Sequence, residues 1–242
     1  MSTVLKLNNS VVKLNNSVLQ NSVKITDFYN SLLSYWTLNE ASGTRADSFG
    51  SHPMSPTGVS PGGAAGFGNV GNVTTFSSGT GTLETTIPVV TTGDFTASGW
   101  VRLSNNAPSI CGVWSQYAPP GDNFSQKIEL VHDLGNLTST LRSTVDNGTH
   151  YISGATVVPD ETWMHVALTA NGSGSTLYLN NNVEGTSGFA PDFTNVFSTL
   201  LGVTDGGPLE GALVAWGVWN RVLTRAEIRA LYNYGNGVAW PL

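Results

Sequence analysis

The sequence predicts an all-β fold: a two-sheet antiparallel sandwich with one short C-terminal helix, preceded by an extended N-terminal arm. Apolar and polar side chains alternate in segments 94–103, 127–132 and 163–170, which is the pattern of half-buried strands. Turn-forming clusters such as 146–148 and 171–175 separate these segments at the spacing of a sandwich. The 242 residues are 40% hydrophobic and include one cysteine, so core packing and not an intrachain disulfide must stabilise the fold.

Residues 4–24 follow a period of seven. Val4, Val11 and Val18 each open a unit, and Asn-Asn-Ser closes the first two units. A heptad can indicate a coiled coil. Asn and Ser, however, compete for backbone hydrogen bonds and disfavour a helix. We therefore interpret each unit as one short strand followed by a turn.

This arm cannot bury its apolar side chains alone, because two or three four-residue strands enclose almost nothing. Residues 1–33 are expected to dock on another protein or on copies of the same chain, and residues 34–242 to form the sandwich. A free tether is the alternative. The expected assembly contacts are Val4, Leu5, Leu7, Val11, Val12, Leu14, Val18 and Leu19.

A hairpin is predicted in the second half of the body. Segments 175–179 and 183–186 alternate in polarity and flank three asparagines at 180–182. Asparagine tolerates the left-handed backbone that tight hairpin turns require.

The predicted helix lies near the C-terminus. Thr224 and Glu227 have the spacing of a capping box, and Ile228 and Leu231 form an apolar stripe behind it. Gly235 stands where the helix is expected to stop.

Composition excludes several classes of function. The net charge is −6 and only 11% of residues are charged, so a protein that neutralises nucleic-acid phosphates is not expected. No run of 18 apolar residues indicates a membrane span, and the N-terminus lacks the apolar run of a signal peptide. We expect synthesis in a cytoplasm and no export by the general route.

Several motifs follow one another along the body. They are the aromatic-Trp-x-Leu stretch at 35–43 with Asp47 and Ser48, the strand at 95–101, the Trp-x-His-Val-Ala strand that opens at Trp163 with its hairpin at 178–180, and the strand and helix at 211–228. As an ordered set they resemble the bacterial and phage branch of the laminin G-like (LamG-like), concanavalin A-like jelly rolls. The resemblance covers about residues 34–242 and implies a jelly-roll topology.

The arm has a resemblance of its own. Leu5 to Asn9 is similar to the virion-anchoring ends of phage fibre and head-decoration proteins. Together with a lectin-like body, it implies a structural protein at a virion surface, whose partners are other virion proteins or its own copies.

Relatives on this fold include glycoside hydrolases, which use a pair of catalytic carboxylates. Glu129 and Asp133 are the nearest pair, but four residues along a strand separate them by about 13 Å, which is too wide even for an inverting pair. Cys111 is expected in the core, and His132, His150 and His165 lack metal-binding spacing. We expect no enzyme activity.

Calcium is left open by the resemblance. Relatives often carry a calcium-binding Asp in the last strand, where this chain has Val214, and the loss of one carboxylate weakens a site of hard oxygen ligands. We expect no cofactor. Asp47 and Asp205 are weak candidate ligands for a different calcium site.

Carbohydrate binding requires aromatic faces flanked by hydrogen-bonding groups. Trp36, Trp100 and Trp163 match the family core and are expected to pack inside. A glycan-binding platform is predicted on rim loops, which carry binding more often than strand interiors do. Its candidate residues are Trp114, Tyr117, Asp122, Asn123, His150 and Tyr151, for which rim packing or subunit contact is an equal alternative.

The expected function is display of a lectin-like domain on a virion, with weak multivalent binding to glycans or a host surface. The alternatives are a free bacterial or secreted carbohydrate-binding or adhesion module, and a glycoside hydrolase. Deletion of the arm distinguishes the first two, and replacement of Glu129 and Asp133 tests the third.

Overall fold

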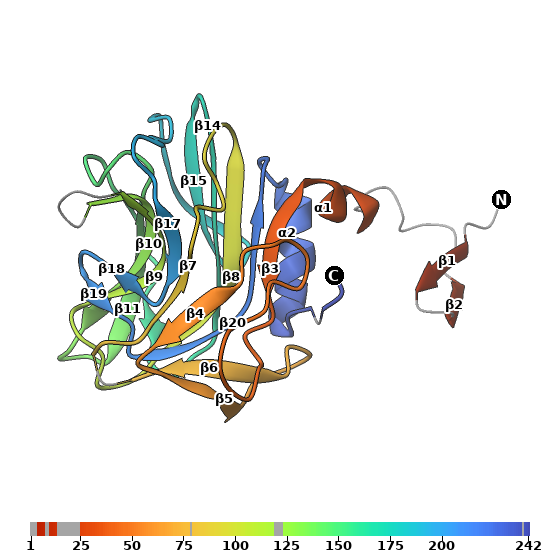
Figure 1. The fold of residues 1–242 in the computed structure, drawn as a ribbon, viewed down its shortest axis with the longest axis horizontal. Coiled ribbons are helices and arrows are strands. Elements are labelled where there is room, and N and C mark those ends of the chain that lie inside the picture. The colour runs from red at the N-terminus through yellow and green to blue at the C-terminus, as the bar shows by residue number, and fades with distance from the viewer. Residues whose placement is uncertain (1–3, 8–9, 14–24, 78, 119–122, 239) are drawn as a thin grey trace.

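The computed structural model describes residues 4–7, 10–13, 25–77, 79–118, 123–238 and 240–242. Two large antiparallel sheets face each other (Figure 1). The predicted fold class is confirmed.

We call the first sheet the open sheet. Its strands run in the order β12, β11, β10, β9, β17, β7 and β4, and β13 also pairs with β11. Their bounds are β12 Ile152–Ser153, β11 Thr138–Thr144, β10 Asn123–Asp133, β9 Ile110–Ala118, β17 Ser198–Leu201, β7 Thr82–Thr85, β4 Met54–Thr57 and β13 Val158–Pro159.

We call the second sheet the covered sheet. Its order is β16, β15, β14, β8, β20, β6 and β5, and β3 pairs with β20. The bounds are β16 Asn182–Ser187, β15 Gly174–Leu179, β14 Met164–Asn171, β8 Phe95–Leu103, β20 Gly211–Trp219, β6 Asn72–Phe76, β5 Val59–Ala65 and β3 Leu32–Trp36. The predicted hairpin is confirmed, because β15 and β16 pair across the three asparagines.

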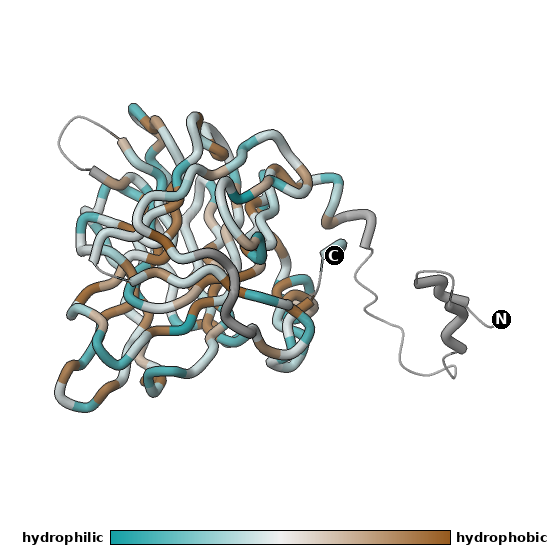
Figure 2. Tube along the Cα trace, turned by 60° about the horizontal axis from the view of Figure 1, so that its bottom comes forward, coloured by the Kyte–Doolittle hydropathy of each residue, from teal (hydrophilic) through white to brown (hydrophobic). Residues whose placement is uncertain are grey.

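The main core lies between the sheets. Trp36, Phe95, Trp216 and Cys111 are among its buried residues, as expected of strands whose alternate side chains point inward. Apolar and polar residues are interspersed along the sandwich (Figure 2). The burial of Cys111 in this core confirms the prediction from the sequence.

Two helices pack on the outer face of the covered sheet (Figure 1). Helix α2, Arg225–Tyr232, begins with the predicted capping box of Thr224 and Glu227, and Ile228 is buried beside Trp219. The short 3-10 helix η1, Asn233–Gly235, follows it. Helix α1, Ile25–Ser31, contributes Phe28 to the same cluster.

Phe28 and Leu32 are both buried in this cluster, although residues 1–33 were predicted to form the arm. The sandwich therefore begins before residue 34. The apolar groups of α1 and the start of β3 have a surface of the body to cover, which local sequence does not indicate.

The three tryptophans that were expected to pack inside lie in two different clusters. Trp36 and Trp100 are buried, and Trp163 packs against the cluster that contains Trp100 on the outer face of the covered sheet. Within the described residues, no helix is both long and apolar enough to cross a membrane.

The N-terminal repeat forms a separate two-stranded sheet. Strand β1, Val4–Leu7, pairs antiparallel with β2, Ser10–Lys13. One strand per unit is therefore confirmed for the first two repeats. Leu14, Val18 and Leu19 lie outside the described residues, and so do the side chains of β1 and β2.

Candidate functional site

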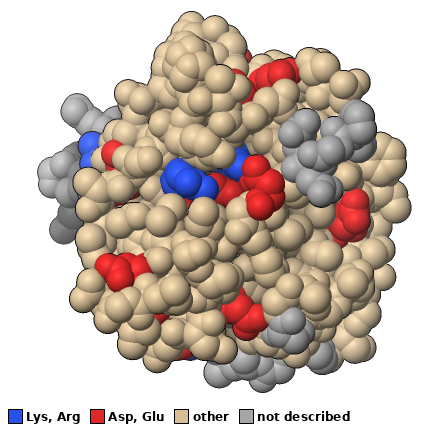
Figure 3. Space-filling model, turned by 90° about the vertical axis from the view of Figure 1, so that its left-hand side faces the viewer, with Lys and Arg blue, Asp and Glu red and all other residues tan. Residues whose placement is uncertain are grey.

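The outer face of the open sheet carries a set of charged side chains. Lys127 and Glu129 alternate with the core residues Ile128 and Leu130 along β10, so they point away from the core. Their strand pairs with β11, where Arg142 stands directly opposite Glu129. Basic and acidic atoms gather near the middle of this face, which is otherwise mostly uncharged (Figure 3).

A small hairpin folds over this face. It consists of β18, Val203–Thr204, and β19, Gly207–Pro208. It approaches β9 at Gly112, where a Cβ atom would lie only 2.2 Å from the backbone nitrogen of Thr204. A residue without a side chain is needed there, and the close approach brings Thr204 and Asp205 to β10.

We call Lys127, Glu129, Arg142, Tyr151, Thr204 and Asp205 the ionic site. Both Nε and Nη2 of Arg142 donate to Oε2 of Glu129, at 3.0 and 2.7 Å. The Thr204 hydroxyl donates to Oε1 of the same carboxylate at 2.6 Å. Lys127 Nζ lies 3.5 Å from Oε1 and donates to Asp205. The buried carboxylate thus has partners on both oxygens.

Burial decides the electrostatics. The side chains of Lys127 and Glu129 are 1% and 0% exposed, whereas that of Asp205 is 44% exposed. Burial by itself lowers the pKa of Lys127, but hydrogen bonds to Asp205 and Tyr151 and the charge of Glu129 raise that pKa above its usual value. Lys127 is therefore charged, and the site holds two cations against two carboxylates.

Tyr151 covers the two cations. Its ring centroid lies 4.5 Å from Arg142 Cζ and 5.2 Å from Lys127 Nζ, within cation–π range. The residue is nevertheless 40% exposed. The ring is thus held from below while part of it faces solvent.

His150 stands beside Tyr151 in the chain and is also exposed. Its Nδ1 lies 2.6 Å from Asp146 Oδ2, and its ring stacks on Phe189 at 3.5 Å between centroids. Of the predicted platform residues, Tyr151 and His150 therefore present aromatic rings to solvent.

Trp114 does not belong to a surface platform, so this part of the prediction is wrong. It is 0% exposed within the main core. The register between β9 and β10 shifts at this point, with Ile128 opposite Trp114 and Glu129 opposite Gly112. The extra residue is a β-bulge that turns Trp114 inward.

Two other platform candidates, Tyr117 and Asn123, lie in the same strands. Tyr117 is half-buried in β9, with its ring 5.5 Å from that of Phe124. Asn123 begins β10. The side chain of Asn123 and all of Asp122 lie outside what the structure describes.

Glu129 and Asp133, the two carboxylates considered as a possible catalytic pair, have separate structural roles. Glu129 is fully engaged in the ionic site. Asp133 is exposed and accepts hydrogen bonds from the backbone nitrogens of Gly135 and Asn136, at 2.9 and 3.2 Å. It therefore stabilises the turn after β10.

The candidate calcium ligands are engaged as well. Asp47 accepts from four backbone nitrogens, those of Tyr35, Phe49, Gly50 and His52, at 2.8–3.1 Å. Burial raises the pKa of Asp47, but the backbone bonds from Tyr35, Gly50 and His52 and a side-chain bond from Ser34 bring that pKa below its ordinary value. Asp205 pairs with Lys127. No group of three His, Cys, Asp or Glu among the described residues is arranged to hold a metal. Both candidate carboxylates thus already have partners within the protein.

Sequence reasoning missed Lys127, Arg142 and Thr204 as members of a site. The signal for the first was available, because a Lys two residues before a Glu on one strand places both on the same face. The contribution of Thr204 and Asp205 depends on the folded-over hairpin, which no local pattern predicts.

Comparisons with known proteins agree with this architecture. Residues 77–229 match the family model of the concanavalin A-like lectin/glucanases superfamily. No curated protein matches the chain in sequence.

Solved structures with the same fold have low sequence identity. A sialidase from Trypanosoma rangeli has a TM-score of 0.68 and 13% identity, over 86% of this chain and 34% of that one. Domain 4 of an extracellular arabinanase from Geobacillus stearothermophilus, in complex with arabinotriose, has a TM-score of 0.58 and 20% identity, over 83% and 97%. Botulinum neurotoxin type C, whose cell entry depends on two ganglioside molecules, has a TM-score of 0.58 and 14% identity, over 87% and 53%.

The chain spans about a third of the length of the sialidases that it matches. At these identities the likeness concerns the fold. The expected LamG-like, concanavalin A-like jelly roll is confirmed, because the family model covers more than half of the sequence, from before β8 to within α2. The chain belongs to the concanavalin A-like lectin/glucanases superfamily.

Proposed function

We propose that this protein is a non-catalytic glycan-binding module, and that the ionic site is where a glycan docks. The observation that carries the proposal is the position of Tyr151, whose ring rests on Lys127 and Arg142 and yet is 40% exposed. An aromatic ring fixed in place gives a sugar an apolar surface at little entropic cost. The partly exposed Asp205 supplies an acceptor for hydroxyls beside it.

Two structural neighbours support a glycan as the ligand class. The arabinanase domain was solved with arabinotriose, and the neurotoxin interacts with gangliosides. The lack of catalysis is proposed from the state of Glu129. A buried carboxylate that accepts from Arg142 and Thr204 is neither free to act as a nucleophile nor placed to protonate a leaving group.

The test is a microarray of bacterial-surface and host glycans, probed with wild-type protein and two variants. Tyr151→Ala is expected to lower the signal on the bound glycans by about two- to tenfold, because removal of the ring forfeits an aromatic contact worth about 0.5–1.5 kcal/mol. Tyr151→Phe keeps the ring and is expected to retain most of the signal.

Tyr234→Ala is the matched control. Tyr234 is 74% exposed and also lies over an arginine, with Arg229 Cζ at 5.1 Å from its ring centroid. It is on η1, away from the open sheet. Wild-type protein that binds no glycan, or equal loss in both alanine variants, would contradict the proposal.

We further propose that the N-terminal arm, residues 1–24, attaches this module to a virion, through other virion proteins or through copies of the chain. Support comes from the β1–β2 hairpin, which pairs with no other described strand and by its length needs a further surface to cover it. The localisation is then a virion surface, and the rival is a free carbohydrate-binding or adhesion module.

Deletion of residues 2–24 separates these two. Full-length and truncated proteins are incubated with virions and sedimented, or their masses are compared by light scattering. We expect the truncated protein to remain folded and to lose particle association or self-association. If both proteins behave as identical monomers that never sediment with virions, the attachment role is wrong and the free module stands.

A further inference from the structure

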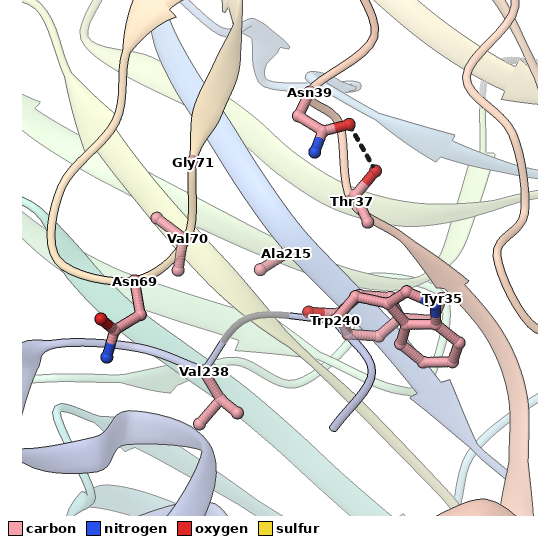
Figure 4. A pocket seen from close by; sticks show the side chains of 9 residues that line it. All are labelled: Tyr35, Thr37, Asn39, Asn69, Val70, Gly71, Ala215, Val238 and Trp240. Atoms are coloured by element: carbon pink, nitrogen blue, oxygen red, sulfur yellow. Dashed lines mark hydrogen bonds between the residues drawn. The ribbon is translucent and has the colours of Figure 1, made fainter. Parts of the chain in front are cut away.

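A pocket lies on the opposite side of the sandwich from the ionic site, at the edge of the covered sheet. It is lined by Tyr35, Thr37, Asn39, Asn69, Val70, Gly71, Ala215, Val238 and Trp240 (Figure 4). Its volume is about 280 Å³, close to the lower limit of about 300 Å³ for small-molecule sites. A ligand about the size of one sugar ring fits this space.

Four distant segments build the pocket. Tyr35 lies in β3 and Ala215 in β20, Asn69 lies between β5 and β6, and Trp240 lies in the C-terminal tail. Trp240 stacks on Tyr35, with 4.7 Å between ring centroids, and this pair forms one wall (Figure 4). The tail is held in place because the Tyr29 hydroxyl donates to the Leu242 carbonyl at 2.7 Å.

The opposite wall is also fixed. The backbone nitrogen of Asn69 donates to the Asn236 carbonyl at 3.0 Å, which ties the loop before β6 to the tail. Ala215 lies between the walls (Figure 4). Its φ is +54°, a left-handed conformation that costs an alanine energy, and it occurs at a register shift in β20. Such strain is retained where the surrounding structure imposes it, often at binding sites.

The chemistry of the lining is neutral. No described lining residue carries a charge, and the polar side-chain groups are the hydroxyls of Tyr35 and Thr37, the amides of Asn39 and Asn69 and the indole N–H of Trp240. The Thr37 hydroxyl donates to Asn39 Oδ1 at 2.9 Å. Within the described part of the chain, the side-chain amide of Asn69 and the Nδ2 of Asn39 have no hydrogen-bond partner, and both residues are exposed. Amides that both donate and accept suit hydroxyls, and Trp240, Val70 and Val238 suit C–H groups.

Buried polar atoms without hydrogen-bond partners lie next to the pocket. A small cavity of about 10 Å³ shares Tyr35, Ala215 and Val238 with the pocket and is also lined by His165 and Trp219. Among described groups, His165 Nδ1 and Trp219 Nε1 are buried without partners. This volume is about that of one water-sized probe.

The tautomer of His165 follows from its neighbours. The Ser98 hydroxyl donates to the Val166 carbonyl at 3.0 Å, so at 3.0 Å from His165 Nε2 it acts as the acceptor. Nδ1 is then a bare acceptor, while the indole Nε1 of Trp219 is a donor. The described residues that line this small cavity thus include one unpartnered donor, Trp219 Nε1, and one unpartnered acceptor, His165 Nδ1.

We propose that this pocket binds a single neutral sugar ring, such as the terminal residue of a glycan. The sugar hydroxyls bond to Asn39, Asn69 and Thr37, and its C–H face packs on the Trp240 wall. The inference rests on the proposed glycan-binding function, but it uses residues on the other sheet. The protein would then engage glycans at two separate places.

The experiment is saturation-transfer NMR with the methyl glycosides of glucose, galactose, mannose and N-acetylglucosamine, on the full chain. At least one is expected to bind. Asn69→Trp fills the pocket and is expected to abolish the signal, and Asn69→Ala to weaken it several-fold. Asn72→Ala, an exposed asparagine of β6 outside the lining, is the matched control and should bind like wild type.

Two further comparisons define the ligand and separate the sites. The uronic acid of the bound sugar is expected to bind about tenfold more weakly, because an anion would be desolvated without a cation beside it. Tyr151→Ala should leave the NMR signal intact. If Asn69→Trp does not fold, Asn69→Ala and Asn39→Ala decide.

Absence of binding by all four glycosides, or a signal that survives Asn69→Trp, overturns the pocket assignment. In that case glycan binding on the microarray that still requires Tyr151 leaves the proposed function standing. Loss of microarray binding by Tyr151→Ala together with loss of the NMR signal by Asn69→Trp supports both sites independently.

Discussion

The two sheets of the sandwich share one core but have different outer faces. The outer face of the covered sheet is overlaid by α1, α2 and the tail, and residues such as Trp219 and Ile228 form a second apolar cluster there. The outer face of the open sheet instead carries Lys127, Glu129 and Arg142, roofed in part by the β18–β19 hairpin.

This contrast shows how the same architecture creates two kinds of site. Where further elements cover a sheet, the gaps they leave at its edge become neutral pockets. Where a sheet stays open, charged side chains can be buried only if they pair with each other, and they then fix an exposed ring. The following predictions test the difference between the two faces.

The largest effect is expected from Glu129→Ala. The change leaves Lys127 and Arg142 without their shared buried carboxylate, which costs about 3–5 kcal/mol in the free energy of unfolding. Chemical denaturation measures it. Glu184→Ala is the control, because that carboxylate only accepts from Thr156 at the surface and its loss should cost less than about 1 kcal/mol. Equal losses of unfolding free energy in the two variants would show that Glu129 does not stabilise the protein more than a surface carboxylate does.

Gly112→Ala is expected to displace the β18–β19 hairpin. The new Cβ would lie 2.2 Å from Thr204 N, and such overpacking costs about 1–3 kcal/mol. Gly172→Ala is the matched control, since nothing lies within 4 Å of its Cβ position. Thermal unfolding reports the change, together with the glycan binding that we propose for the ionic site. A Gly112→Ala protein that matches wild type in both would contradict the packing described here.

A smaller, pH-dependent effect belongs to the covered sheet. Burial lowers the pKa of His165 to about 3, below the value of about 6.5 in the unfolded chain. The unfolded state therefore binds a proton that the folded state does not, and stability falls as pH drops from 6.5 towards 3, by about 1.4 kcal/mol per pH unit. Tyr35 also lies near His165, but burial raises the pKa of its hydroxyl, so it does not titrate in this window.

The measurement is the free energy of unfolding between pH 6.5 and 5, a range that lies above the titration of most carboxylates. His165→Gln should flatten the slope, whereas His150→Gln, at an exposed histidine, should not. A slope that is unchanged in His165→Gln would show that the buried imidazole is not the group responsible.

Local patterns predicted several elements correctly. The capping box of Thr224 and Glu227 and the hairpin around residues 180–182 depend on neighbours in sequence, so the sequence alone specifies them. The same holds for the strand in each of the first two N-terminal repeats. The family motifs predicted the sandwich, because they follow one another along the chain in the order in which its strands occur.

The candidate site was only partly predictable. Tyr151 and His150 were identified from a turn and a rim position. Trp114 was assigned to the surface because it leads into a predicted rim loop, but the bulge in β9 turns its side chain into the core. A bulge is a property of the pairing between two strands, and the sequence of one strand does not reveal it.

The sequence by itself therefore determined the fold class, the capped helix and a neutral, hydrogen-bonding surface, because these follow from periodicity and composition. Only the tertiary structure decided that Lys127, Glu129 and Asp205 meet under Tyr151, and that Tyr35 and Trp240 enclose a pocket. The physical reason is that both sites join segments up to 205 residues apart, and contacts at that range are fixed by packing and by strand pairing, not by local propensity.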